Sequence, residues 1–270
     1  MSIVAYNLFF SLVMLGVSLF TGCMTVPGTN KRALNILPRS QELQMGEEAY
    51  QEILKKEKRS KNPKLTSLLE RVGQRISQVT GITDFKWEFA LIENPQMNAF
   101  CLPGGKVAFY TGILPVLENE GAMAIVMGHE VAHAVAQHGA QRVSQALVTQ
   151  LGLAAIDVAI LKDSKYRNLT LGLLGAGAQF GVLLPHSRSN ETEADSLGIR
   201  YAAQAGYDPA EGAAFWERFS RATGAGGKPP EFMSTHPSDT SRIENLKGLS
   251  QEVMQIYLAS PQYGKGEKLL

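Results

Sequence analysis

Residues 121–138, GAMAIVMGHEVAHAVAQH, decide the fold. The segment is mostly apolar, lacks proline, and contains an HExxH motif between His129 and His133. On an α-helix these two histidines lie on one face, about 6 Å apart along the axis, so both can reach one metal ion. Imidazole suits zinc, whose open fourth position in catalytic sites holds a water molecule. Glu130 lies beside the metal and can take a proton from that water as it attacks a peptide carbonyl.

A purely structural interpretation assigns two helix histidines and a salt-bridging glutamate to this segment. Burying these three groups in an apolar helix without partners would be costly. The motif therefore predicts one Zn²⁺ per chain, with His129 and His133 as ligands and Glu130 as the catalytic base.

A third protein ligand is expected downstream, in Asn190-Glu191-Thr192-Glu193-Ala194-Asp195. Asn190 is a candidate N-cap, which places Glu193 in a capping position. Glu191 and Asp195 are four residues apart and share one helix face. We predict that Glu191 binds zinc and that Asp195 accepts a hydrogen bond from the other nitrogen of a ligand histidine.

The surrounding pattern predicts a mainly helical α+β domain with a small antiparallel sheet. Helices are expected from residue 40 and from Asn62-Pro63, where Asn62 is the N-cap. Alternation predicts a strand near residues 85–91, and two short strand-like runs, 99–102 and 106–111, lie on either side of a turn at 103–105. We expect an edge strand along the cleft that pairs with extended substrate through backbone hydrogen bonds; its residues are Asn98, Ala99 and Phe100.

The N-terminus carries an apolar run, residues 3–20, that ends at Thr21-Gly22-Cys23. A cleaved signal peptide, a membrane anchor and a lipoprotein signal are all compatible with its length. The small residues before Cys23 favour the lipoprotein, although no Lys or Arg precedes the run and Phe20 is large for its position. The expected divisions are a signal at 1–22, a tether at 23–39 and a peptidase domain at 40–270.

A lipid on Cys23 would attach the chain to a membrane and leave Cys101 as a packed thiol without a disulfide partner. The alternative is a Cys23–Cys101 bridge in an oxidising compartment. Met24 stands where an inner-membrane retention signal would have Asp, so we expect the periplasmic face of the outer membrane.

Two apolar stretches, residues 146–161 and 169–185, are each slightly short for a membrane span and contain polar residues. Buried or groove-lining helices are favoured over a membrane hairpin. The formal net charge of +1 argues against nucleic acid as a partner.

Four segments resemble the zinc metallopeptidases that include HtpX, the CAAX prenyl endopeptidases and bacterial lipoprotein peptidases such as LoiP, YcaL and BepA. They are NAFCLPGGKVAFYTGIL at 98–114, GHEVAHAVAQHGAQR at 128–142, NETEADSLG at 190–198 and STHPSDTSRIENL at 234–246. The resemblance implies zinc on His129, His133 and Glu191, catalysis by Glu130, and a compact gluzincin-like fold. The chain ends soon after the last segment, so lipoproteins without a tetratricopeptide domain are the expected comparison.

His236 has two functional interpretations besides that of a loop residue. It could donate a hydrogen bond to the developing oxyanion, or it could act as a fourth metal ligand that closes the site. His138 and His186 are assigned structural roles.

These features predict a zinc endopeptidase for misfolded or unassembled envelope proteins, with outer-membrane assembly machinery as a candidate partner. Two alternatives stay open: an HtpX-like integral-membrane peptidase, and a zinc-binding chaperone or scaffold without proteolytic activity.

Overall fold

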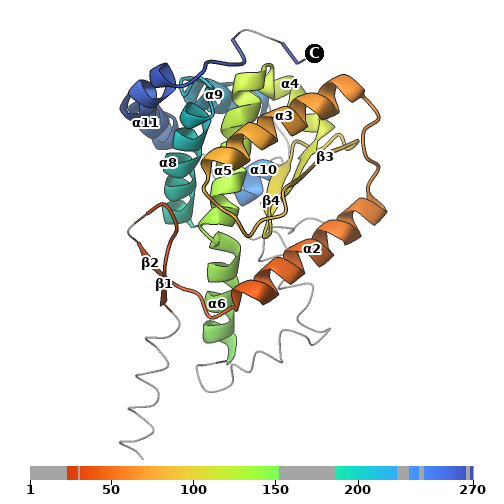
Figure 1. The fold of residues 1–270 in the computed structure, drawn as a ribbon, viewed down its shortest axis with the longest axis vertical. Helices are drawn as coiled ribbons and strands as arrows, with labels where there is room; N and C mark the ends of the chain where they lie inside the picture. The colour runs from red at the N-terminus through yellow and green to blue at the C-terminus, as the bar shows by residue number, and fades with distance from the viewer. Residues whose placement is uncertain are drawn as a thin grey trace, which may run out of the picture.

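A computed structural model describes residues 23–29, 31–151, 187–223, 231–236, 240–265 and 268–269. The main element is helix α5, which lies at the centre of the domain (Figure 1). It spans Glu120–Val135, and each of its residues is buried. Asn119 caps the helix, because its side chain accepts a hydrogen bond from the Ala122 backbone N–H. The HExxH motif therefore lies on the most deeply enclosed helix of the described chain.

Helix α5 has α8 and α11 on one side and the sheet on the other, and α2 lies across the sheet from it (Figure 1). Helix α3 is capped by Asn62, whose side chain accepts from the Leu65 N–H, as the sequence predicts. The helices are α2 (Arg39–Lys56), α3 (Pro63–Val79), α4 (Leu114–Leu117), α6 (His138–Leu151), α8 (Arg188–Gln204), α9 (Glu211–Thr223), α10 (Glu231–Thr235) and α11 (Thr240–Ala259), with a 3₁₀ turn η1 at Thr111–Ile113.

The sheet has three strands in the order β3-β5-β4, namely Glu88–Ile92, Lys106–Tyr110 and Ala99–Leu102. Strand β4 pairs antiparallel with β5, but β3 pairs parallel with β5. The predicted mainly helical α+β class with small antiparallel strand pairing is confirmed, and the parallel pairing of β3 makes this sheet mixed. At the tight turn formed by Gly104 and Gly105, both at positive φ, the chain reverses, so β5 runs antiparallel to β4. The other edge of β5 then pairs with β3.

Both faces of the sheet are covered. Val107 and Phe109 of β5 belong to the core cluster that contains α3 and α5, while Ala108 and Tyr110 belong to the cluster that contains α2. This alternation follows the two-residue period of a strand. Cys101 points to the α5 side and is buried, so it packs in the core as expected.

Helices α5 and α8 meet backbone to backbone at two glycines. A Cβ atom on Gly128 would lie 2.5 Å from the Gly198 carbonyl oxygen, and one on Gly198 would lie 2.6 Å from the His129 nitrogen. Real Cβ atoms essentially never approach so closely, so only glycine fits at both positions. This contact brings the start of α8 against the HExxH segment.

The stretch expected as a tether is folded in the structure. Strand β1 (Cys23–Thr25) pairs antiparallel with β2 (Arg32–Leu34), and the hairpin packs beside α6. Val26 is buried in the main core, which holds the hairpin against the domain. Cys23 is exposed and Cys101 is buried, and the structure has both as thiols without the alternative Cys23–Cys101 bridge.

The N-terminal apolar run, residues 152–161 of the first apolar stretch and the whole of the second, 169–185, lie outside the described residues. Among the helices that the structure describes, none combines the length and the apolar character that a membrane crossing requires.

Candidate active site

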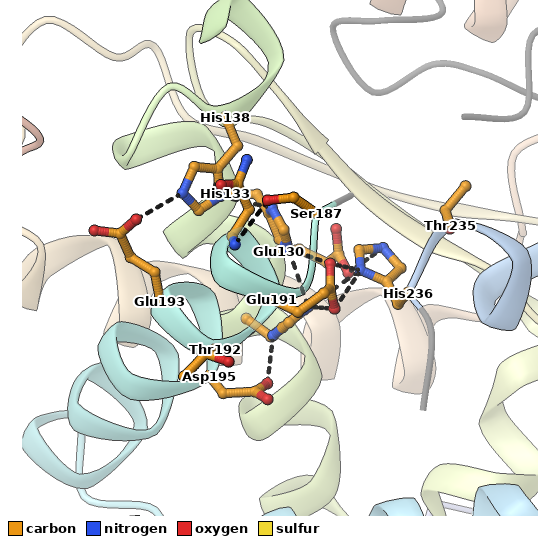
Figure 2. A network of polar contacts seen from close by, with 12 residues as sticks. Glu130, His133, His138, Ser187, Glu191, Thr192, Glu193, Asp195, Thr235 and His236 are labelled. Atoms are coloured by element: carbon orange, nitrogen blue, oxygen red, sulfur yellow. Dashed lines mark hydrogen bonds and ion pairs between the residues drawn. The ribbon is translucent and has the colours of Figure 1, made fainter. Parts of the chain in front are cut away.

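Four buried side chains from three parts of the chain converge beside α5. His129 and His133 come from α5, Glu191 from the first turn of α8, and His236 from the residue after α10. One potential ligand atom of each lies within 4.8 Å of the others. Figure 2 shows Glu191 between the HExxH helix and His236. The structure thus brings together every residue for which the sequence suggests metal contact.

The spacing of these atoms fits a tetrahedral zinc site. His129 Nε2 lies 3.1 Å from His133 Nε2 and 3.2 Å from His236 Nδ1. The Glu191 carboxylate lies 3.1–3.4 Å from the same nitrogens of all three histidines. Ligands about 2.0–2.1 Å from zinc at tetrahedral angles are about 3.3 Å apart. A set of imidazoles and one carboxylate is also the chemistry that zinc prefers.

Asp195 has the contact that the sequence predicts. Its Oδ1 lies 2.8 Å from His129 Nδ1, which fixes the proton on that nitrogen and leaves Nε2 for the metal. Arg242 of α11 holds the same carboxylate by two hydrogen bonds of 2.8 Å and lies 2.9 Å from Glu191. Its guanidinium also stacks over Trp216, 3.9 Å from the ring centroid.

Arg242 is a site residue that sequence reasoning missed. It lies within the segment STHPSDTSRIENL, but an arginine in a charged helix has no local feature that distinguishes it from a solvent-exposed one. Its role becomes visible only because α11 packs along α8.

His133 is oriented by a second pair of residues. His138 Nδ1 lies 2.9 Å from His133 Nδ1, and His138 Nε2 lies 3.3 Å from Glu193 Oε2. Figure 2 shows Glu193 joined to His138 by a dashed line, apart from Asp195. The hydrogen bond from His138 lowers the pKa of Glu193 to about 2. Glu193 is therefore a carboxylate that orients the second ligand histidine through His138.

This pair corrects two expectations. Helix α8 begins one turn earlier than predicted, with Ser187 as N-cap accepting from the Asn190 N–H, so Glu193 has no capping role. His138 does more than pack, because the chain leaves α5 through Gln137 at a φ of 57° and α6 then starts with His138 turned back towards His133. His186 lies outside the described residues.

Glu130 is suited to act as a base. It is buried, and burial raises the pKa of its carboxyl above the usual range. Its Oε1 lies 3.4 Å from His236 Nε2 and makes no hydrogen bond with other described residues. A carboxyl whose pKa is raised by burial is a stronger base than an ordinary glutamate, which favours uptake of a proton from water.

The predicted substrate strand overlaps β4, which is an edge strand because the order in the sheet is β3-β5-β4. Asn98, Ala99 and Phe100 are all buried, and Phe100 packs towards α2. The Phe232 N–H of α10 faces the Met97 carbonyl at 3.4 Å, so the helix that directly precedes His236 contacts the residue just before Asn98. Pairing of substrate with these residues stays a prediction.

A buried HExxH helix, a glutamate from a second helix and oriented imidazoles define the zinc metallopeptidase class. The family model for peptidase family M48 matches residues 63–250. The chain belongs to peptidase family M48, and it is a zinc metalloendopeptidase.

Named relatives agree with this class. The chain is 38% identical over 239 residues to "Mitochondrial metalloendopeptidase OMA1" of Schizosaccharomyces pombe, covering 86% of this chain and 68% of that protein. It is 31% identical to the "Metalloendopeptidase OMA1, mitochondrial" of Bos taurus, over 88% of this chain and 48% of the relative. It is 27% identical to the "Beta-barrel assembly-enhancing protease" of Escherichia coli K12, over 88% of this chain and 50% of the relative. The chain thus spans about half the length of the latter two.

Zinc binding is expected to release about one proton at pH 7. Burial opposes a proton on His129, but its hydrogen bonds to Asp195 and Glu191 outweigh burial and raise its pKa to about 9. Burial lowers the pKa of His133, so that ring is already neutral. Because His129 must lose its proton to bind metal, the apparent zinc affinity should rise about tenfold per pH unit between pH 7 and 8. Calorimetry in buffers of different ionisation enthalpy measures the proton count; a value near zero at pH 7 would contradict the prediction.

Proposed function

We propose that this zinc metalloendopeptidase acts at the periplasmic face of a bacterial outer membrane on misfolded or unassembled envelope proteins. The observation that carries the catalytic part is the set of donors from His129, His133 and Glu191 at 3.1–3.4 Å, with Glu130 beside them. The envelope part is supported by the lipobox-like sequence before the exposed Cys23 and by the similarity to the beta-barrel assembly-enhancing protease of Escherichia coli. Other relatives carry mitochondrial names, so the location needs its own test.

Each polar residue has a defined task in this proposal. Zinc would be held by His129, His133 and Glu191. Bound there, it would act as a Lewis acid and lower the pKa of a water molecule attached to it. Glu130 accepts the proton of the attacking water and returns it to the leaving amine. Asp195, together with Arg242, keeps His129 in the tautomer that leaves Nε2 available. Burial of the cluster strengthens each of these interactions.

Extended substrate would pair with the edge strand through backbone hydrogen bonds, which selects for unfolded chain more than for a particular sequence. Unfolded casein is therefore a suitable substrate for testing the activity. Protein lacking residues 1–22 should bind one zinc ion and hydrolyse casein. Absence of both would reject the catalytic part of the proposal.

In this proposal His236 would act as a cap on the metal. Its Nδ1 would be the fourth donor beside His129, His133 and Glu191, and a metal held by all four would have no open position for water. If the state with His236 on the metal is more stable than the open state by about 1.4 kcal/mol, roughly a tenth of the molecules are open. His236→Ala would open all of them and should raise basal casein hydrolysis about tenfold. A histidine that instead stabilises the oxyanion would contribute about 3 kcal/mol, and its removal would lower the rate about 10²-fold. Kinetics with zinc in excess decide between a rise and a fall.

Anchoring through Cys23 is tested by Cys23→Ser. Several acyl chains on one cysteine contribute about 0.8 kcal/mol per buried CH₂, so their loss should change membrane association strongly. We expect a protein without added lipid mass that is released from the membrane fraction or kept only by an uncleaved signal. Unchanged mass and fractionation would reject lipidation. The integral-membrane alternative is separated by the protease accessibility of a tag near Lys162, which a membrane hairpin would place on the opposite side or protect.

A further inference from the structure

We propose that the N-terminal hairpin, residues 23–29 and 31–34, helps to position the zinc ligand His133, acting through Lys31, Glu193 and His138. The inference concerns zinc ligation and does not depend on the location or substrate proposed above. Its starting point is that a stretch expected to be a tether packs against the residues that orient a metal ligand.

Lys31 is the residue of the hairpin that reaches the site. Its Nζ lies 3.4 Å from Glu193 Oε2 and 3.1 Å from the hydroxyl of Ser189, both on α8. The Lys31 side chain is half exposed, whereas that of Glu193 is only 5% exposed. The same oxygen, Oε2, is the one that His138 contacts at 3.3 Å. The ammonium group and the imidazole therefore hold one carboxylate oxygen between them.

Zinc binding determines which nitrogen of His133 and of His138 carries the proton. To bind metal through Nε2, His133 must carry its proton on Nδ1, and that N–H donates to His138 Nδ1 at 2.9 Å. His138 must then carry its own proton on Nε2, which donates to the Glu193 carboxylate. A fixed Glu193 thus selects the His138 tautomer that accepts from His133. A displaced Glu193 would allow His138 to carry its proton on Nδ1, against His133.

A second contact reaches the same histidine from the other side. Just after β2, the Asn35 side-chain amide donates to Gln137 Oε1 at 2.6 Å. Gln137 is the left-handed residue that separates α5 from α6 and turns His138 back towards His133. The Ile36 N–H also donates to the Ser144 hydroxyl of α6 at 3.0 Å. The hairpin and the residues after it therefore contact both supports of His138, namely Glu193 and the α5–α6 turn.

The experiment measures zinc affinity in the full chain by chelator competition. Lys31→Glu places a carboxylate against Glu193, and we expect zinc to bind about 10- to 100-fold more weakly, as for other losses of an outer-shell contact. Lys31→Arg keeps the cation and should bind zinc like wild type. Arg32→Glu is the matched control, because it makes the same charge change at an exposed residue of the same hairpin. Urea unfolding of the metal-free proteins should show that any loss of stability in Lys31→Glu is smaller than its loss of zinc-binding free energy.

A double-mutant cycle with Glu193→Gln supplies the decisive comparison. If Lys31 acts through Glu193, the Lys31→Glu change should cost little further affinity once Glu193 is neutral. The proposal is overturned if Lys31→Glu binds zinc like wild type, if Arg32→Glu weakens binding equally, or if the Lys31→Glu effect is undiminished in the Glu193→Gln background. It is also overturned if the loss of affinity is matched by an equal loss of metal-free stability, because that would show a general effect on folding.

Discussion

Replacing Glu130 with Gln is expected to lower kcat/KM on unfolded casein by about 10²- to 10⁴-fold while zinc content stays at one ion per chain. The side chain is buried beside the ligand cluster but is not among the four donors that converge. An amide has nearly the same shape as the carboxylate, so the ligands should keep their places. It cannot accept a proton near neutral pH, however, and the base for the attacking water is lost.

The same variant separates the two classes of function. A zinc-binding chaperone or scaffold without proteolytic activity would be insensitive to Glu130→Gln, and any casein cleavage in its preparations would persist. The measurement is single-substrate kinetics together with zinc analysis of the same sample. Equal rates for the variant and wild type would sink the proteolytic mechanism. Loss of zinc in the variant would show instead that Glu130 helps to hold the metal.

Glu191→Ala is expected to remove zinc and activity together. Structural zinc sites bind with roughly 10–16 kcal/mol, so each of four ligands supplies about 3 kcal/mol, equivalent to more than 10²-fold in affinity. The Glu191 carboxylate contacts three histidines. Burial opposes its charged form. The neighbouring charge of His236 and the hydrogen bonds from His129 and His133 nevertheless keep the pKa of Glu191 well below its usual range. Glu191 is therefore ionised and ready to bind metal at any working pH.

Two controls make this result specific. Glu244→Ala removes an exposed glutamate on α11 and should leave zinc affinity unchanged. Glu193→Ala removes a carboxylate that contacts His138, so its effect should be smaller, about 10- to 100-fold. Chelator competition ranks the three proteins. A ranking in which Glu193→Ala loses zinc while Glu191→Ala retains it would reverse the ligand assignment.

Local sequence patterns predicted those elements that are determined by neighbouring residues. Asn62-Pro63 predicted the start of α3, residues 99–102 predicted β4, and the HExxH spacing predicted two imidazoles on one helix face. In each case the deciding information lies within a few residues: a capping side chain, a short strand-like run beside a turn, or a four-residue spacing. The Glu191–Asp195 pair could likewise be predicted, because both residues lie on one turn of α8.

What the sequence could not predict depends on segments far apart in the chain. The parallel pairing of β3 with β5 follows from where β4 is placed, which no strand pattern encodes. Two signals pointed the wrong way: Asn190 is as good a capping residue as Ser187, and His138 is five residues after His133, away from the ligand face of a continuous helix. Only the left-handed Gln137 and the packing of α8 bring His138 and Glu193 together.

The Gly128–Gly198 contact offers a criterion for recognising such sites in other sequences. HExxH by itself is short enough to arise by chance, and it says nothing about which distant acid completes the site. Here the first histidine directly follows one glycine, and the other glycine lies three residues beyond Asp195 and seven beyond Glu191. Because the two backbones touch at these points, the pair G-H-E-x-x-H and E-x-x-x-D-x-x-G encodes a crossing of two helices as well as a set of ligands. A search for both patterns together would select chains in which the acid is geometrically able to reach the metal.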